Sequence, residues 1–406
     1  ANVITSNINA QTVLNAYSQA LTPSLSISGL IGNQVNALKT NTDAATGRDF
    51  LDPNFVSMNN TSTRSTWNTL DQRRLVSFFG QAVLDYKDFW YVTVTGRNDW
   101  TSTIPRPHNS FFYPSVRTSF VFSDAFPSVR PFVTGLVRLG YAKAGKDARP
   151  YADKPSLVYT TTSYGGYRYD FWGPNPLLRP EFKTSIEGGV ELSFLNGRLA
   201  LDATAYRATT KAQIVNDIRG SYGTGFILFN LNGASTRSRG LELTVRGAPI
   251  LRPEFSWDVE LNWNSAGSVV TGLPNVPESY VSDTWLYGNV RNGVRRGMST
   301  MALTGAFYLR NDRGDLLIDP ATGLPIRSTD FIDAGYDRQP DFNLGLTNTF
   351  RYKRFTLDFL LDIRKGGDVF NATEHYLTAR GLSPRTLDRE QPRVIPGVLR
   401  DGRENT

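Results

Sequence analysis

Hydrophobic and polar residues alternate one by one over long segments of this chain. In residues 255–264 every odd-numbered residue is apolar and every even-numbered residue is polar, and residues 355–364 repeat the pattern with Leu360 as the exception. A period of two places successive side chains on opposite faces of a strand. We therefore predict strands with an aromatic-rich face and an acidic face, which suit a β-barrel with lipid outside and water inside.

The same alternation, interrupted by turn signals, predicts eleven strands. They span residues 23–36, 73–85, 89–100, 112–123, 131–145, 183–195, 198–210, 236–248, 254–266, 340–352 and 354–367. The first 20 residues carry a weaker pattern and are expected to form a loop or the end of a strand.

The connections between these strands alternate between short and long. Tight turns are expected at residues 86–88, at Asn196–Gly197 and at Lys353, whereas residues 146–182 and 267–339 form long connections. Outer-membrane barrels combine short periplasmic turns with long outer loops. The predicted fold class is therefore all-β, an antiparallel transmembrane β-barrel with long extracellular loops.

Two further observations bear on the barrel. Trp90 and Trp100 have the same parity, and at about 3.3 Å per residue and a tilt near 40° they would stand roughly 25 Å apart, the height of an apolar band between two aromatic girdles. Ordinary core aromatics of a β-sandwich are the alternative.

The predicted strands do not close a barrel. Their number is odd, and an open sheet would expose unpaired edges to lipid, so we expect residues 1–406 to be a fragment of a larger barrel.

Composition excludes several classes of protein. The chain has no cysteine, a mean hydropathy of −0.32 and no long apolar run that would form a transmembrane helix. The net charge of +7 is spread along the chain, without the concentrated basic stripe that nucleic-acid binding needs. Basic residues near an outer rim would instead meet anionic lipid headgroups. The start at Ala1 lacks the features of a signal peptide.

The parity of the strands assigns a set of carboxylates to the wet interior, because each would be costly on a lipid-facing surface. These lumen-facing candidates are Glu187, Glu191, Asp202, Glu242, Asp258, Glu260, Asp358 and Asp362. Three roles are open for them: hydrogen bonding to sugar hydroxyls, pairing with a plug, or pairing with neighbouring arginine and lysine in a hydrated wall.

One long connection is dense in aromatic residues and glycine. Its candidates for ligand or partner binding are Tyr164, Tyr167, Tyr169, Phe171 and Trp172. Exposed rings stack on the apolar faces of sugars or bury against a capping protein. Packing of the loop against itself is the third alternative.

Catalysis has little support in the sequence. The two histidines, His108 and His375, lie far apart in or near predicted loops. A hydrolase would need one of them beside a carboxylate and a nucleophile. We therefore expect a protein that is not an enzyme.

Several motifs occur together in one order. They are residues 96–103 (GRNDWTST), 112–116 (FYPSV), 178–187 (LRPEFKTSIE), 238–243 (SRGLEL), 385–389 (RTLDR) and 396–398 (PGV). This ordered set resembles SusC/RagA-type TonB-dependent outer-membrane transporters over most of residues 70–406.

The resemblance implies a barrel of about 22 strands with an N-terminal plug. It implies TonB-linked import of an oligosaccharide or peptide, with a SusD-type surface lipoprotein and a TonB complex as partners. We identify no plug and no TonB box in the sequence, so their residues are not assigned. A structural component of a cell-envelope complex and a passive porin remain the alternatives.

The resemblance also extends to a calcium-type loop in residues 311–319 (NDRGDLLID). Alternating oxygen ligands at Asn311, Asp315 and Asp319 would suit Ca²⁺. Arg313 occupies a ligand position, however, and Leu316 replaces the glycine of the turn. We therefore expect a solvated polar loop without a cofactor, and calcium binding is the weaker alternative.

Overall fold

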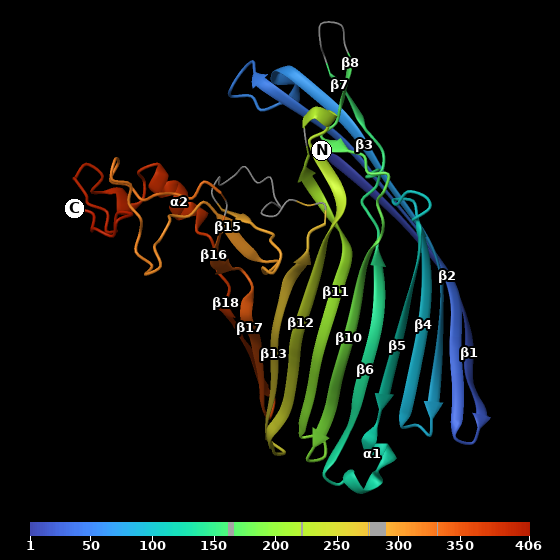
Figure 1. Cartoon of the computed structure of the whole chain (residues 1–406). Coiled ribbons are helices and arrows are strands. Elements are labelled where there is room, and N and C mark those ends of the chain that lie inside the picture. The colour runs from blue at the N-terminus through green and yellow to red at the C-terminus, as the bar shows by residue number, and fades with distance from the viewer. Residues whose placement is uncertain (161–165, 221, 275, 277–289, 331) are drawn as a thin grey trace. The chain divides into compact units, whose positions relative to one another are not determined.

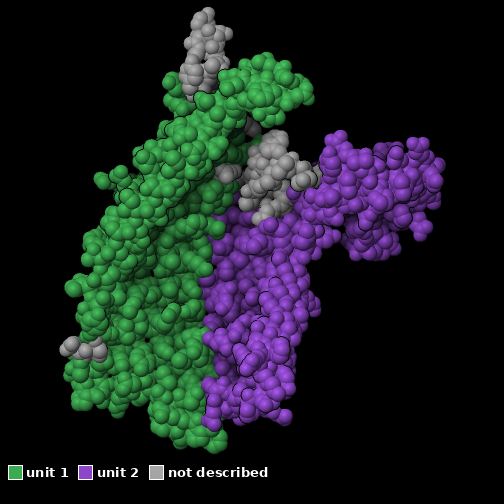
Figure 2. All heavy atoms as spheres, turned by 180° about the vertical axis from the view of Figure 1, so that it is seen from behind, with its two compact units in different colours: residues 1–192, 210–232 green, residues 193–209, 233–406 purple. Residues whose placement is uncertain are grey.

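The structure is a computed structural model that describes residues 1–160, 166–220, 222–274, 276, 290–330 and 332–406 (Figure 1). The described residues form two compact units, residues 1–192 with 210–232 (unit 1) and residues 193–209 with 233–406 (unit 2), as Figure 2 shows. Strands β11 (Leu199–Arg219) and β12 (Leu228–Leu251) contribute residues to both units.

Unit 1 is built on neighbouring strands in the order β1-β2-β3-β4-β5-β6-β10. They are β1 (Asn2–Thr22), β2 (Leu25–Phe50), β3 (Thr61–Tyr86), β4 (Trp90–Thr101), β5 (Ser110–Phe120), β6 (Val133–Lys146) and β10 (Glu181–Phe194). The connections add η1 (Met58–Asn60), α1 (Phe122–Ala125), η2 (Pro127–Val129), β7 (Leu157–Thr160), β8 (Gly166–Tyr169), β9 (Trp172–Gly173) and η3 (Tyr222–Thr224).

Unit 2 follows the same principle with the order β12-β13-β17-β18. Strands β13 (Phe255–Gly272), β17 (Pro340–Tyr352) and β18 (Phe355–Gly366) pair antiparallel with their neighbours. The long connections contain a small sheet of β14 (Val290–Asn292), β15 (Ala302–Gly305) and β16 (Ile332–Asp337), together with α2 (Ala372–Ala379) and η5 (Pro384–Thr386). Among the described residues, no helix has the length and apolar character needed to cross a membrane.

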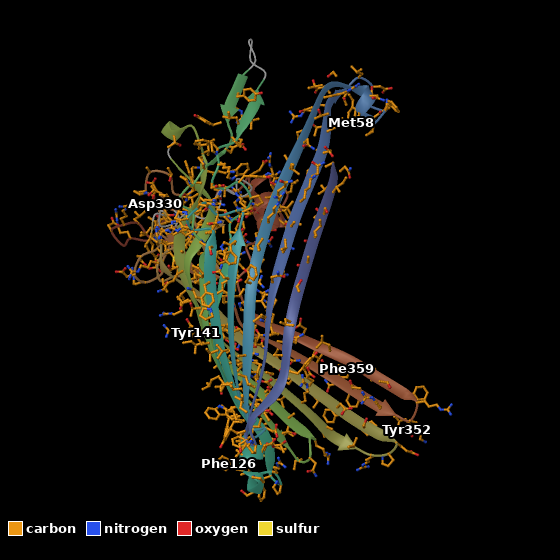
Figure 3. The ribbon with its side chains drawn as sticks, turned by 90° about the vertical axis from the view of Figure 1, so that its right-hand side faces the viewer. Met58, Phe126, Tyr141, Asp330, Tyr352 and Phe359 are labelled. Carbon is orange, nitrogen blue, oxygen red and sulfur yellow. The ribbon has the colours of Figure 1, made fainter. Side chains whose placement is uncertain are left out.

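Short and long connections lie at opposite ends of the strands in each unit (Figure 1). Figure 3 shows this for unit 1, where Met58 follows β2 at one end and Phe126 follows β5 at the other. In unit 2, Asp330 and Tyr352 mark the two ends in the same way. The alternation of connection lengths predicted from the sequence is therefore confirmed.

The structure corrects the limits of several predicted strands. Strands β11 and β13 continue to Arg219 and Gly272, beyond the predicted ends at 210 and 266, and β12 begins at Leu228 rather than at residue 236. Residues 2–22, expected to be a loop or a strand end, form the full strand β1, which adds one strand to the predicted eleven. Strands β2 and β3 extend well beyond their predicted limits, to Phe50 and back to Thr61. The hairpin after β10 contains the predicted Asn196 and Gly197, but its turn spans the four residues 195–198, and Leu195 has positive φ together with them.

The strand register gives each unit two chemically distinct faces. In unit 2, Trp257 lies opposite Phe350 and stacks on it with ring centroids 5.5 Å apart, and Phe350 stacks on Phe359 at 6.1 Å. Phe359 and its neighbours of the same parity on β18 are exposed, Phe355 by 78%. We call this side the apolar face and the opposite side, which carries Asp258, the polar face.

Unit 1 has the same two faces. Trp90, opposite Phe120, and Trp100, opposite Ser110, lie on its apolar face and are exposed by 47% and 40%. A small buried cluster of Ile104, Ala148, Ala152 and Leu178 lies where the long connections meet the strand ends. A wide apolar surface thus remains exposed, as expected of a sheet with lipid on one side.

Candidate functional site

The polar face of unit 1 carries a row of side chains that crosses four neighbouring strands. Gln34 of β2 lies opposite Ser77 of β3, which lies opposite Asp99 of β4. Arg97 connects all three, with its guanidinium 2.8 Å from Asp99 Oδ1, 2.7 Å from Ser77 Oγ and 3.0 Å from Gln34 Oε1. Tyr113 of β5 donates its hydroxyl to the other Asp99 oxygen. Asp99 is thereby buried without an unpaired charge.

A second charged cluster forms directly after β6. The guanidinium of Arg73 donates two hydrogen bonds to Asp147, at 2.8 and 3.1 Å. The hydroxyls of Thr101 and Thr103 donate to the same carboxylate at 2.6 and 2.9 Å. Burial acts to raise the pKa of Asp147, but the bonds from Arg73 and the two threonines outweigh it and hold that pKa below its usual range.

Both clusters are built from the segment 96–103, and the sequence reasoning did not assign them a role. Its alternation places Arg97, Asp99, Thr101 and Thr103 on one side and Trp100 on the other. That alternation was the signal available in the sequence. The partners Ser77 and Asp147 lie on β3 and after β6, and a single strand does not reveal them.

The structure places the predicted lumen-facing acids on the polar face of their units. Glu187 lies 3.6 Å from Arg117 and Glu191 pairs with Arg138, both within unit 1. In unit 2, Glu260 lies 2.8 Å from Arg246 and Asp258 pairs with Arg351. Asp202 interacts electrostatically with Arg246, Glu242 lies opposite Asn264, Asp358 lies opposite Thr349 and Asp362 lies opposite Gly345.

Most of these acids therefore face an arginine of their own unit, and the polar face is in large part a charge-paired wall. Glu191, Glu260 and Asp258 each pair with an arginine on an adjacent strand, and Glu187 reaches Arg117 of β5 across β6. Such a surface is hydrated and offers both hydrogen-bond donors and acceptors to a polar solute.

The aromatic connection of unit 1 packs partly against itself and partly against the connection between β11 and β12. Trp172 lies 5.1 Å from the guanidinium of Arg149 in its own connection, and the Tyr169 ring contacts the tilted ring of Phe226 in the other, with centroids 4.6 Å apart. Gly225, at φ +81°, lies so close to the Tyr169 ring that a Cβ atom would approach it to 2.8 Å. Tyr164 lies outside the described residues.

The same connection also surrounds an open cavity. It has a volume of about 680 Å³ and is lined by Leu157, Tyr167, Arg168, Tyr169, Asp170, Phe171, Gly225 and Ile227. Tyr167 is 71% exposed, Tyr169 51% and Phe171 47%. Self-packing and an exposed aromatic surface thus coexist in this segment.

The remaining predicted residues lie in the long connections. Asn311 uses its side-chain oxygen to accept the backbone N–H groups of Arg313 and Asp315, and Asp319 caps a separate turn at Ala321. No three His, Cys, Asp or Glu side chains in the described part of the chain are grouped to hold a metal. His375 is exposed and contacts the Phe370 ring, and His108 lies in the connection after β4.

Exposed apolar faces, charged polar faces and alternating connections define an outer-membrane β-barrel. Residues 4–364 match the family described as TonB dependent receptor-like, beta-barrel, and the chain belongs to this family. The predicted fold class and family resemblance are both confirmed, and so is the bacterial outer membrane as the location.

The chain is similar to TonB-dependent receptor P26 of Formosa agariphila, with 27% identity over 324 residues, covering 73% of this chain and 32% of that protein. It is 24% identical over 338 residues to TonB-dependent receptor SusC of Bacteroides thetaiotaomicron, covering 76% and 32%. The chain thus spans about a third of the length of these relatives.

Solved structures agree on the fold. The RagAB peptide transporter superposes with a TM-score of 0.70 at 16% identity, covering 89% of this chain and 41% of that chain. The outer membrane transporter YddB of Escherichia coli gives a TM-score of 0.55 at 10% identity, covering 89% and 42%.

Proposed function

We propose that the protein containing this chain imports a large nutrient, an oligosaccharide or a peptide, by TonB-linked active transport. Its partner in this role is a SusD-type surface lipoprotein. Membership of the TonB-dependent receptor family is the observation that carries the proposal. The similarity to SusC and the shared fold with the RagAB peptide transporter support the choice of substrate class and partner.

The chemistry of the polar faces supports passage of a polar solute. Paired charges such as Arg246–Glu260 and Arg117–Glu187 neutralise each other locally, yet they keep the wall hydrated. A hydrated wall with donors and acceptors along it exchanges hydrogen bonds with sugar hydroxyls or peptide groups at little net cost.

The aromatic connection of unit 1 supplies the first contact in this proposal. Tyr169 and Phe171 are exposed at the end of the strands that carries the long connections. Their rings would stack on the apolar face of a sugar or bury against the lipoprotein. We further propose that the protein binds and conducts its substrate without covalent chemistry.

Uptake by living cells tests the proposal. A deletion strain complemented with the full-length gene is supplied with labelled oligosaccharides and peptides, with and without a protonophore. We expect uptake of one substrate class to require both the gene and the proton gradient. The double variant Tyr169→Ala/Phe171→Ala is expected to lower uptake or lipoprotein binding about tenfold, because two aromatic contacts are lost.

Tyr308→Ala is the matched control, because Tyr308 is an exposed aromatic in a long connection of unit 2. It should leave uptake unchanged. Uptake that persists with the protonophore would favour a passive porin, and a protein that takes up nothing but forms a stable envelope assembly would favour a structural role. Activity that disappears in His108→Ala or His375→Ala would instead point to an enzyme.

A further inference from the structure

Three arginines of unit 2 line one open cavity near the end of the strands that carries the long connections. Arg207 comes from β11, and Arg237 and Arg239 come from β12. The cavity has a volume of about 580 Å³, and its other lining residues are Gly267, Ser268, Val269, Ser299, Asp337 and Gln339. Volumes of this size are typical of binding sites for small molecules and headgroups.

The register places two of these arginines on the apolar face. Leu243 lies opposite Trp263, whose ring contacts Phe342 with centroids 6.5 Å apart, and Trp263 shares the parity of Trp257. Arg239 and Arg237 precede Leu243 by four and six residues and therefore share its parity. They lie nearer the long connections than Leu243 does. The apolar face thus changes from aromatic and aliphatic to basic within a few residues.

Arg207 belongs to the same side. Tyr206, its neighbour on β11, fills the space beside Gly240, whose parity is that of the polar face. Because successive side chains of a strand alternate, Arg207 lies on the apolar face with Arg237 and Arg239. Gly267, opposite Arg239, carries no side chain and leaves the cavity open there.

The charge of this cavity is not balanced from within the described residues. All three arginines are exposed, and none makes an ion pair or hydrogen bond to another described residue. Asp337 is the one carboxylate among the lining residues, and one of its oxygens accepts the backbone N–H of Gln339 at 2.8 Å. On the polar face, in contrast, Glu187, Glu191, Asp258 and Glu260 each pair with an arginine.

We propose that Arg207, Arg237 and Arg239 bind a phosphate group of an outer-leaflet lipid, with its acyl chains lying along the apolar face below. Guanidinium groups bind phosphate oxygens bidentately, and a basic cluster just above an apolar band lies at the depth of lipid headgroups. The Ser299 hydroxyl and the Gln339 amide line the same cavity and supply neutral donors. The lipid is a phosphorylated glycolipid of the lipid A type, held on the outside of the barrel.

Native mass spectrometry of the purified full-length protein tests the site. The protein is titrated with phosphorylated lipid A and with the same lipid after enzymatic dephosphorylation. We expect binding of the phosphorylated form to exceed that of the dephosphorylated form. Arg237→Gln/Arg239→Gln should weaken binding of the phosphorylated lipid about 30-fold, since each cationic side chain near a membrane surface contributes about fivefold.

The matched control is Arg252→Gln/Arg354→Gln, which removes the same charge from exposed arginines in the short turns at the opposite end of unit 2. Its lipid binding should equal that of the wild type. Equal losses in both double variants would overturn the proposal, as would equal binding of the two lipid forms. Competition by millimolar inorganic phosphate as effective as that by the lipid would show a soluble-anion site instead.

Discussion

The polar faces of the two units carry the same kinds of ion pair in different surroundings. In unit 1 the side chains of Asp147 and Asp99 are 10% and 7% exposed. In unit 2 the side chains of Asp258 and Glu260 are 43% and 38% exposed. The Asp147 and Asp99 pairs of unit 1 are closed off where the long connections meet the strands. The unit 2 pairs lie on open strand surface, as do the exposed Glu187 and Glu191 pairs of unit 1.

This difference separates two uses of charge. A buried pair contributes little net stability, but loss of one partner leaves an uncompensated ion and costs about 3–5 kcal/mol. An exposed pair is screened by water and contributes about 0–1 kcal/mol. The unit 1 clusters therefore fix the positions of strands and loops, while the unit 2 pairs keep a wall hydrated at little cost to stability.

The largest expected effect is that of Asp147→Ala. The substitution leaves Arg73 without its carboxylate and removes the acceptor of the Thr101 and Thr103 hydroxyls. We expect the free energy of unfolding to fall by about 3 kcal/mol, at the lower end of the range because Arg73 is partly exposed. Urea unfolding of the full-length protein in lipid vesicles measures it.

Asp258→Ala is the control on the exposed side of the comparison. It removes the carboxylate that pairs with Arg351 and should cost less than about 1 kcal/mol. If both variants lost the same stability, exposure would not be what distinguishes the two units.

Acidification should abolish the contribution that the ionised Asp147 carboxylate makes to the free energy of unfolding. Because the pKa of Asp147 in the folded protein lies below the ordinary value of 3.8, its ionised form stabilises the fold fully above that pH. The stabilisation is lost as the pH falls below 3.8 and through the folded-state pKa. The stability difference between the wild type and Asp147→Asn should therefore narrow on acidification below that point; a difference that stays constant would contradict the assignment.

The sequence predicts those structural features that are local to one strand and fails for those that depend on pairing between strands. The alternation in residues 255–264 predicts β13 and its two faces, because parity is a property of a single segment. Strand β1 was missed because Asn2–Thr22 is rich in polar residues on both faces, and its pairing with β2 outweighs the weak pattern.

The chemistry of the Asp99 and Asp147 clusters depends on pairing between strands, so it could not be predicted from the sequence. Asp99 and Asp147 look like any other acids in the sequence, and only the register brings Ser77 and Arg73 to them. The parity of Arg237 and Arg239 was readable in principle. Its meaning required the register with β13, which places them above Trp263 on the apolar face.

A smaller effect is expected from Tyr113→Phe. The variant removes the hydroxyl that donates to the buried carboxylate of Asp99, while Arg97 still pairs with that carboxylate. We expect a loss of about 1–2 kcal/mol in the free energy of unfolding. Tyr91→Phe removes a hydroxyl whose bond to the Asp88 carbonyl is exposed and should cost about 0.5 kcal/mol or less. The reverse order of the two losses would contradict the role given to burial.

The smallest expected effect on stability is that of calcium binding to the loop of residues 311–319 in unit 2. A large stabilisation by calcium would contradict the comparison of the two units, because the exposed acids of this loop would then form a stabilising charge centre like the clusters of unit 1. Asn311 already directs its oxygen to two backbone N–H groups, and Arg313 lies 3.4 Å from Asp315. A cation would have to displace both interactions. A site saturated at 100 times its Kd would stabilise the protein by about 2.7 kcal/mol. We expect no such gain when thermal unfolding in excess calcium is compared with unfolding in EDTA, and a rise in Tm that Asp315→Asn abolishes would establish the site.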